Sequence, residues 1–456
     1  MKPLASSYRD TDGYVFEYKG KIYRCIKPEY FTEYRLFLES GLYQQLIDAG
    51  YLVAHTDIDN SEVKILDNDT DKIILPEQIP FISYPYEWSF NMWKDAALLT
   101  LKIANVSLQK GMMLKDATPF NVQFYNGRPV FIDTLSFERY ETEKPWIAYR
   151  QFCECFLGPL LLMHYNYRDA GKLLMVYPNG VPLQVIKGLL PAKAKWNLHV
   201  YLHVWLQEKL SLKRKIKEPD KAAFSKQKLT VLLKGLTDFV TTLNPKKTKS
   251  EWDNYYSETI IGSQYLEAKK IIFESFVSDI NFDIVIDLGT NEGLFALLLK
   301  QRAKLIIAAD EDSNCINKLY DHIKEEKIKN IIPLLNNLVA PSPAIGWCNA
   351  ERASITDRFK GDLILALALV HHLAIGANVP IQYIAQWLSG AGQFLIIEFV
   401  PKSDEKVKQL LLNREDIFED YNLLNFKNIF SNHFFILKEQ KIGDTDRILF
   451  LMKKNN

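Results

Sequence analysis

The chain has 456 residues, which is more than one hydrophobic core usually organises, so we expect two domains. Its composition, 48% hydrophobic and 24% charged, is that of a globular protein. The net charge of +1 gives no electrostatic reason to expect that the chain binds nucleic acid. The longest apolar runs are too short to span a bilayer, and the first residues lack the apolar stretch of a signal peptide. Five cysteines, an odd number spread over both halves, argue against a disulfide framework, so we expect a cytoplasmic protein.

The first part of the chain changes character along its length. Short β-type segments occur at 14–18, 21–27, 72–76 and 80–86, and from 145 to 210 apolar residues recur every three or four positions, which predicts helices. A lysine-rich stretch follows at 210–228. We interpret it as a solvated helix face or linker, with binding to an anionic ligand or surface as the alternative. We place the domain boundary near residue 245.

Residues 112–138 carry the most informative motif of the first domain. Asp116 and Asn121 are five residues apart, Asp133 follows twelve residues later, and Asn126-Gly127 between two β-type runs predicts a hairpin turn. This spacing resembles the catalytic loop and metal-binding segment of kinase-like phosphotransferases. In that family the first Asp accepts the acceptor's proton, and the Asn and second Asp hold Mg²⁺.

Other positions both support and weaken that resemblance. Lys27 ends a predicted strand, as a phosphate-binding lysine would, and Glu33 and Glu39 in the next helical segment are its candidate partners. No glycine-rich loop precedes Lys27, and Leu114 stands where the motif has histidine or glycine. The alternative is that the acids are turn and cap residues of an unrelated α+β domain. We expect residues 1–245 to form a kinase-like α+β accessory domain, with Mg-ATP as cofactor only if it is active.

The second domain, 246–456, opens with a strand and a glycine turn. Residues 284–288 are a β-branched apolar run typical of a strand buried on both faces of a parallel sheet. The turn from Gly289 to Gly293 and an apolar helix follow at once. A turn of this kind lets a cofactor approach the backbone closely, and glycine makes that approach easiest.

The next predicted strand ends in an acid at the spacing expected for nucleoside binding. The run LIIAAD finishes at Asp310, 21 residues after Gly289, and a carboxylate there can accept hydrogen bonds from both ribose hydroxyls. The competing interpretation makes Asp310 a helix N-cap. We prefer ribose binding, because strand, turn, helix, strand and acid come in that order.

The acids around the turn favour a cationic ligand over a diphosphate. Asp287 precedes the turn and Glu292 lies in it, which suits a sulfonium and an amino group. The pattern resembles the D-x-G-x-x-x-G motif of class I S-adenosylmethionine-dependent methyltransferases, with Asn291 where many members have glycine. The resemblance implies that the cofactor contacts Asp287, Gly289, Asn291 and Gly293.

Three further strand-like runs complete the pattern of that family. IIPLLNN ends at Asn337, where such enzymes place a residue near the adenine amine, and DLILALALVHHL and QFLIIEFVP follow. The last 21 residues before Asn455 read as an antiparallel hairpin turning at Gly443-Asp444. We therefore predict an α/β, Rossmann-like methyltransferase domain with an antiparallel last strand.

The segments APSPAIGW, LALALVHHLAI and IIEFVPK narrow the resemblance. They are similar to those of the nodulation-protein-like (NoeA-related) bacterial methyltransferases. This resemblance implies methyl transfer (EC 2.1.1.-) and supplies no acceptor.

Three residues are candidates for catalysis. His371 and His372 follow the fourth strand, where either is a candidate general base, and Glu398 at the tip of the fifth is a candidate to orient an acceptor or to cap the next segment. We predict methyl transfer to O or N of a small-molecule or carbohydrate-type acceptor, without a metal. The alternative is a bifunctional enzyme whose first domain also transfers phosphate.

Overall fold

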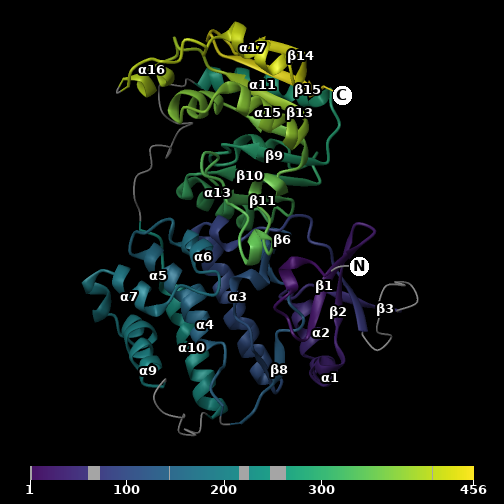
Figure 1. The fold of residues 1–456 in the computed structure, drawn as a ribbon, viewed down its shortest axis with the longest axis vertical. Helices are drawn as coiled ribbons and strands as arrows, with labels where there is room; N and C mark the ends of the chain where they lie inside the picture. Colours follow the sequence, from purple (N-terminus) through teal and green to yellow (C-terminus); the bar gives the residue numbers. More distant parts are fainter. Residues whose placement is uncertain are drawn as a thin grey trace. The chain divides into compact units, whose positions relative to one another are not determined.

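A computed structural model describes residues 3–59, 72–142, 144–214, 225–246, 263–412 and 414–455. The chain divides into two compact units. The first contains 1–247 and 344–353, and the second contains 248–343 and 354–456. Residues 215–224 of the lysine-rich stretch and the segment 251–259 lie outside the described residues. Figure 1 traces the chain from purple at the N-terminus to yellow at the C-terminus.

The first unit begins with a four-stranded antiparallel sheet. Its order is β1-β2-β4-β3, and helices α1 and α2 lie between β2 and β3 in the chain. The bounds are β1 (Gly13–Tyr18), β2 (Lys21–Ile26), α1 (Phe31–Glu39), α2 (Leu42–Asp48), β3 (His55–Ile58) and β4 (Lys72–Pro76). Three of the expected β-type segments are thus strands. The fourth, 80–86, is irregular, because Pro80 and Pro85 lack the amide hydrogen that a sheet ladder requires.

A long buried helix, α3 (Phe90–Gln109), connects this sheet to two small two-stranded antiparallel sheets. The first pairs β5 (Met112–Leu114) with β8 (Phe137–Arg139), and the second is the hairpin of β6 (Val122–Tyr125) and β7 (Arg128–Phe131). Asn126 and Gly127 have φ of 53° and 74°, as a tight hairpin turn requires, so that prediction is confirmed.

The rest of the unit is helical, as the three-to-four-residue periodicity predicts. Its helices are α4 (Tyr149–Phe152), α5 (Gly158–His164), α6 (Leu173–Val176), α7 (Leu183–Leu189), α8 (Leu198–Val200), α9 (Gln207–Arg214) and α10 (Lys226–Thr242). Two π-helical segments, η5 (Cys153–Leu157) and η8 (Tyr201–Leu206), continue α4 and α8. Among the described residues, no helix is both long and apolar enough to cross a membrane.

The second unit is built on a seven-stranded sheet of order β11-β10-β9-β12-β13-β15-β14. Strands β9 to β13 are mutually parallel, and β15 runs antiparallel to both of its neighbours. The bounds are β9 (Ile284–Leu288), β10 (Leu305–Asp310), β11 (Ile331–Leu335), β12 (Gly361–Ala366), β13 (Gly392–Phe399), β14 (Phe434–Lys441) and β15 (Ile448–Lys454). The expected strand series and antiparallel final strand are confirmed.

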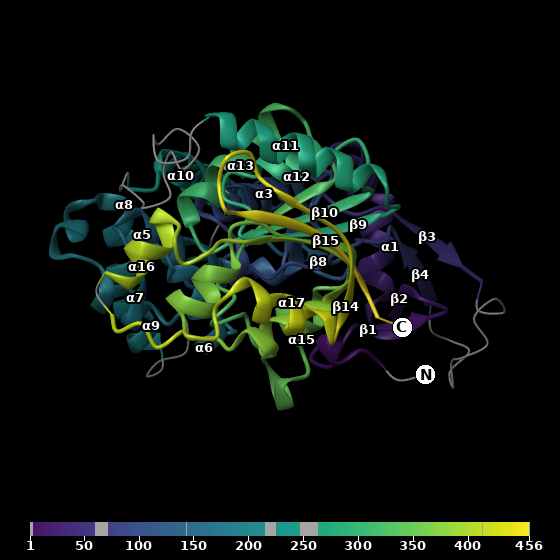
Figure 2. The ribbon, with the colours of Figure 1, turned by 90° about the horizontal axis from the view of Figure 1, so that it is seen from above.

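Helices cover both faces of this sheet, because its central strands are apolar on both sides. Figure 2 shows α11 (Ser263–Ser278), α12 (Leu294–Leu298) and α13 (Ser313–Glu325) on one face. Helices α15 (Ile381–Ala391) and α17 (Leu423–Ser431) cover the other. The remaining helices are α14 (Ile355–Arg358) and α16 (Glu405–Leu411).

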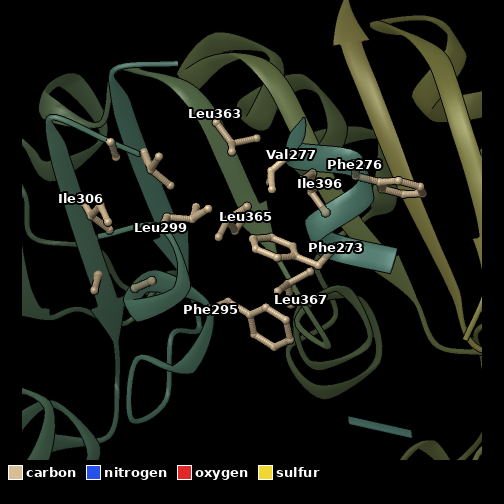
Figure 3. Close-up of a cluster of buried hydrophobic side chains, with 14 of the residues drawn as sticks. Phe273, Phe276, Val277, Phe295, Leu299, Ile306, Leu363, Leu365, Leu367 and Ile396 are labelled. Carbon is tan, nitrogen blue, oxygen red and sulfur yellow. The ribbon is translucent and has the colours of Figure 1, made fainter. Parts of the chain in front are cut away.

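The core under α11 to α13 is aromatic and aliphatic. Figure 3 shows Phe273 of α11 and Phe295 of α12 beside Leu365 and Leu367, and the two aromatic rings meet edge to face with centroids 5.0 Å apart. Buried apolar surface of this kind is the main stabilising contribution to such a layer. It also fixes α11 over the carboxyl ends of the strands, where the candidate site lies.

A ten-residue loop of the methyltransferase-like sequence, 344–353, belongs to the first unit. Its Glu351 is buried and accepts a hydrogen bond from Arg9 at 3.0 Å. The Arg352 guanidinium lies 3.7 Å from the centroid of the Phe120 ring, and the Ala353 amide donates to the Tyr84 hydroxyl at 3.1 Å. A single boundary near 245 therefore does not describe the whole division of the chain.

Candidate functional site

A cavity of about 450 Å³ lies at the carboxyl edge of the central strands of the second unit. In parallel α/β sheets, ligands bind outside this edge where the strand order reverses, here between β9 and β12. The lining comes from α11, the glycine turn and the segments that follow β10, β11 and β12. Its polar members are Tyr265, Lys269, Asp287, Thr290, Asn291, Asp310, Glu311, Asn336, Asn337 and His372.

The glycine turn depends on left-handed backbone at three positions. Gly289, Asn291 and Gly293 have φ of 70°, 52° and 82°. Asparagine tolerates this region better than most residues, which accounts for Asn291 where the family motif has glycine. A Cβ atom on Gly293 would lie 2.5 Å from Leu319 Cδ1, so this glycine also lets α13 approach the turn.

Asp310 lines the cavity at the end of β10. Its two carboxylate oxygens accept hydrogen bonds from the backbone amides of Asn291 at 2.7 Å and Asp312 at 2.9 Å. Burial is the main cause that raises the pKa of Asp310 to about 6. The N-cap of α13 is Asp312, whose side chain accepts from the amides of Asn314 and Cys315, so capping that helix is the role of the neighbouring acid.

Asp287, at the end of β9, is almost completely buried. Its carboxylate accepts a hydrogen bond from the Thr290 hydroxyl at 2.6 Å. Burial raises its pKa to about 6, and the nearby Lys269 opposes that shift. The buried Asp287 and the half-buried Asp310 in one cavity give it a negative potential suited to a cationic ligand.

The two asparagines after β11 have different surroundings. Asn337 uses its side-chain oxygen to accept the amides of Val339 at 2.7 Å and Ala340 at 3.2 Å, which shapes the loop. Asn336 is buried, lines the cavity, and has neither side-chain polar atom hydrogen-bonded. A buried amide without partners is costly, so Asn336 is the better placed of the two to meet a ligand. The repeated NN pair was the sequence signal for it.

The two histidines also separate. His372 lines the cavity at the start of η10 (His372–Gly376), whereas His371 is nearly inaccessible, and the two tilted rings have centroids 4.1 Å apart. Burial and the charges of Lys406 and Arg447 lower the pKa of His372 to about 4, so its imidazole is neutral at pH 7. Ala368 nearby has φ of 50°, a strained conformation for alanine in a loop that lines the cavity.

Glu398 is not among the residues that line the cavity, and its expected roles, orienting an acceptor or capping the next segment, stay predictions. It is fully buried, and its carboxylate contacts Lys269 at 2.6 Å and the Tyr265 hydroxyl at 2.5 Å. Arg447 lies between Glu398 and Asp404: its guanidinium is 3.4 Å from the Glu398 carboxylate and 2.8 Å from that of Asp404. These cations hold the pKa of Glu398 below its usual range despite burial. Glu398 therefore positions Tyr265 and Lys269, which do line the cavity.

Sequence reasoning missed Tyr265 and Lys269, although a signal was present. With Phe273 and Phe276 they recur at positions that share one face of α11, and that face is buried against the sheet. A lysine within an apolar stripe has to find a buried partner, which here is Glu398.

The first unit gathers a second polar cluster. Asp133 accepts hydrogen bonds from Arg24 and from the Ser136 hydroxyl, and Asp10 lies 3.8 Å from the same guanidinium. Arg24 and these hydrogen bonds hold the pKa of Asp133 below its usual value although burial opposes them. The negative charge of the Asp133 carboxylate is thus already balanced by the Arg24 guanidinium.

Asp116 and Asn121 belong to the same cluster. Asp116 accepts a hydrogen bond from Gln151 at 2.6 Å, and Asn121 donates to Ser136 at 3.2 Å. Burial, reinforced by the charge of Asp133, raises the pKa of Asp116. The sequence motif therefore does converge in space. Across the described part of the chain, however, no group of three or more His, Cys, Asp or Glu is arranged to hold a metal ion.

The proposed phosphate lysine is displaced from this cluster. Lys27 donates to the Thr11 carbonyl at 3.2 Å on the surface, and Glu33 accepts the Arg139 amide at 2.6 Å. Arg24, three residues earlier on β2, is the cation that reaches Asp133. Alternate residues of a strand face opposite sides and Lys27 lies just beyond the strand's end, so its role in phosphate binding stays a prediction.

The fold and site together define a class. The β11-β10-β9-β12-β13-β15-β14 order with one antiparallel strand, the glycine turn after β9 and the acid at the end of β10 are those of class I methyltransferases, which use S-adenosylmethionine. No family model matches the chain. It is 33% identical over 467 residues to nodulation protein NoeA of Rhizobium meliloti (strain 1021), covering 99% of this chain and 96% of that one. The chain belongs to the NoeA family.

Solved structures resemble part of the chain. N-methyltransferase NodS from Bradyrhizobium japonicum WM9, in complex with S-adenosylhomocysteine, is 9% identical with a TM-score of 0.34 and covers 45% of this chain and 97% of its own. The 16S rRNA methylase RmtB is 13% identical with a TM-score of 0.32, covering 51% and 84%. The class therefore rests on this chain's own sheet order and turn.

Proposed function

We propose that the second unit transfers a methyl group from S-adenosylmethionine to an oxygen or nitrogen atom of a small-molecule or carbohydrate-type acceptor. The observation that carries the proposal is the cavity at the edge of β9 to β12, with two acids and an unpaired amide around a glycine turn. When bound, S-adenosylmethionine supplies an electrophilic methyl group on a sulfonium. The chain's own contribution is then mainly to bind and orient.

The residues that line the cavity fit this cofactor chemically. Asp310 would accept the ribose hydroxyls, and Asn336, with Asn337 shaping its loop, would meet the adenine edge through its unpaired amide. An amide offers both a donor and an acceptor, which an adenine amine and ring nitrogen require. This choice moves the adenine contact one residue from the position that the sequence favoured.

The methionine part of the cofactor carries a carboxylate, an amino group and the sulfonium. Gly289 and Gly293 would give it access to backbone, and Asp287 would offset its positive charge. Lys269 is the single lysine or arginine among the lining residues and would complement the carboxylate. The ion pair with Glu398 would fix the position of the Lys269 side chain.

The acceptor side of the cavity is formed by the loop after β12. We propose that a ring nitrogen of His372 accepts the proton of an acceptor hydroxyl or amine as the methyl group is transferred. A neutral imidazole can do this at pH 7, and the low pKa of His372 keeps it neutral. His371, whose ring contacts that of His372, would fix the orientation of the ring.

The experiment is a calorimetric titration of the full-length protein with S-adenosylmethionine. Asp310→Ala should weaken binding by about tenfold or more, the worth of a charge-assisted hydrogen bond. Asp283→Ala is the matched control, because Asp283 is an exposed acid that pairs with Lys304 just before β9 begins. Unchanged affinity in a folded Asp310→Ala variant would remove the ribose assignment, and no binding by the wild type would remove the proposal.

A second candidate function, phosphoryl transfer by the first unit, is favoured by one observation. Ser136 joins Asn121 to Asp133, and Asp116 lies close enough for the charge of Asp133 to raise its pKa, as the resemblance to kinase-like enzymes implies. Arg24 on Asp133 opposes it, since a metal would have to displace that cation. We rank this function below an accessory role. Titration with Mg-ATP tests it, and binding that Asp133→Ala abolishes would restore it.

We also propose a cytoplasmic location. None of the five cysteines is in a disulfide, and four of them are buried as thiols. Free thiols are the usual state in a reducing compartment. Cell fractionation with a periplasmic marker as control tests this.

A further inference from the structure

An apolar surface in the first unit takes no part in either proposed activity. Trp196, Leu198, Tyr201 and Leu202 have exposed fractions of 90%, 67%, 38% and 38%. They lie in one continuous segment formed by η7 (Ala192–Trp196), α8 and η8. We call these four residues the apolar patch. Large apolar side chains gathered at the surface usually mark an interaction site.

The patch is not needed to fold the segment that carries it. The opposite side of α8 and η8 supplies the core contacts, through Val200, His203 and Val204, which are all buried. His199 stacks on Phe239 of α10 with ring centroids 4.7 Å apart. The helix is therefore apolar on two sides, and only one of them is used by the fold.

Local structure holds the patch outward. The Asn197 side chain accepts hydrogen bonds from the amides of His199 at 3.0 Å and Val200 at 3.2 Å, which fixes the start of α8. Leu198, Tyr201 and Leu202 then recur at intervals of three and four residues, as on one face of a helix. Trp196 stands immediately before the cap and is the most exposed of the large apolar residues.

Most of the charges around the patch are positive. Lys193 and Lys195 are exposed in the same short turn as Trp196, and Lys209 is exposed in α9, just beyond the segment. Among the acids of the neighbouring described elements, Glu208 is paired with Lys187 at 3.2 Å, and Asp238 is exposed on α10. An anionic partner would therefore meet exposed lysines beside exposed aromatic rings.

We propose that the apolar patch docks this protein onto the surface of a membrane that carries anionic lipids. Tryptophan and tyrosine favour the boundary between headgroups and acyl chains, leucine enters the apolar layer, and lysine binds anionic headgroups. The lysines favour this occupant over a protein, since lysine is depleted in protein interfaces. The proposal is independent of the methyl-transfer function and of residues 215–224.

The first test is co-sedimentation of the full-length protein with vesicles of phosphatidylglycerol and phosphatidylcholine. The wild type should bind, and Trp196→Ala/Leu198→Ala should lower the partition coefficient by about tenfold or more. Ile147→Ala/Val176→Ala is the matched control, because both residues are exposed apolar side chains of the same unit. All substituted side chains are exposed, so thermal unfolding should be unchanged in both variants.

The charge contribution has its own variants. Lys193→Gln/Lys195→Gln should weaken binding by about fivefold per lysine at low salt, with the effect shrinking as salt rises. Lys102→Gln/Lys110→Gln, which removes two exposed lysines of the same unit, should leave binding unchanged. Vesicles of phosphatidylcholine alone should bind the wild type much more weakly.

A position-specific readout separates docking at the patch from attraction elsewhere. Brominated lipids should quench part of the tryptophan fluorescence of the wild type, and Trp196→Phe should remove that part. No binding to anionic vesicles, equal binding to neutral ones, or binding that the patch variant leaves intact would overturn the proposal. So would a dimer in sedimentation velocity that Trp196→Ala dissociates, because the patch would then be covered by a second copy.

Discussion

The carboxylates at the cofactor edge and those of the cluster in the first unit differ in what surrounds them. The ionised carboxylate of Asp133 is paired with Arg24 and hydrogen-bonded by Ser136, and both partners hold its pKa low. Asp310 accepts only backbone amides, and burial raises its pKa to about 6. A carboxylate whose charge is paired and hydrogen-bonded within the chain contributes to stability. A carboxylate without such a cation is available to bind a ligand, but it destabilises the unliganded fold.

The largest effect should come from the paired acid of the second unit. Glu398→Ala leaves Lys269 buried without its partner and Arg447 with Asp404 alone, which should lower the free energy of unfolding by about 3–5 kcal/mol. Guanidinium denaturation measures it. Glu405→Ala, which breaks an exposed pair with Lys408, should cost less than about 0.5 kcal/mol. A small loss for Glu398→Ala would mean that pairing does not determine stability here.

A smaller difference should separate the two acids directly. Asp133→Ala should destabilise the protein by about 2 kcal/mol, because Arg24 keeps only the more distant Asp10. The free energy of unfolding of Asp310→Ala should stay within about 1 kcal/mol of the wild type, because removing a desolvated charge offsets the loss of two hydrogen bonds. Equal losses measured by thermal unfolding would break the comparison between the two regions.

The raised pKa of Asp310 predicts how cofactor affinity depends on pH. Below about pH 6 the carboxyl takes up a proton and no longer offers two anionic acceptors, so affinity should fall as pH falls. Between pH 7 and pH 5 the loss from this group should be about tenfold. The stability of the unliganded unit should change the opposite way, because a raised acid pKa favours the fold as pH falls from about 6 toward 4. Titration of Asp310→Asn, which lacks the group, should show a flatter affinity profile.

The smallest effect concerns the turn itself. Asn291→Gly should leave S-adenosylmethionine affinity within about twofold, because glycine adopts the same left-handed backbone freely. Asn291→Val should weaken binding more, since a β-branched residue is strained at φ of 52°. If calorimetry gives the two variants equal affinities, backbone conformation is not what this position supplies.

The second unit was largely predictable because its pattern is local. Strands buried on both faces, a glycine turn and an acid at a fixed distance occur within about thirty residues of sequence, so their spatial relation follows from chain order. Lys269, Glu398 and Arg447 are far apart in the sequence and meet only through packing. No spacing rule could have joined them.

The first unit was harder to predict for the opposite reason. Asp116, Asn121 and Asp133 were identified by spacing, but the cation that meets Asp133 comes from a separate strand and is Arg24 instead of Lys27. One residue's position relative to the end of β2 decides which side chain points inward. Register of this kind is set by pairing with β1 and β4, which the sequence does not display.

The loop at 344–353 has a consequence for dividing the protein experimentally. Because the chain crosses between the units near 247, at 343 and again at 353, a fragment starting near 245 carries a loop whose Glu351 has lost Arg9. That fragment would leave Glu351 with Arg352 as its remaining guanidinium partner, and a fragment ending near 245 would leave Arg9 without the acid. The two units are therefore interleaved in the sequence. A fragment designed to contain the second unit alone should have the loop replaced by a short polar linker.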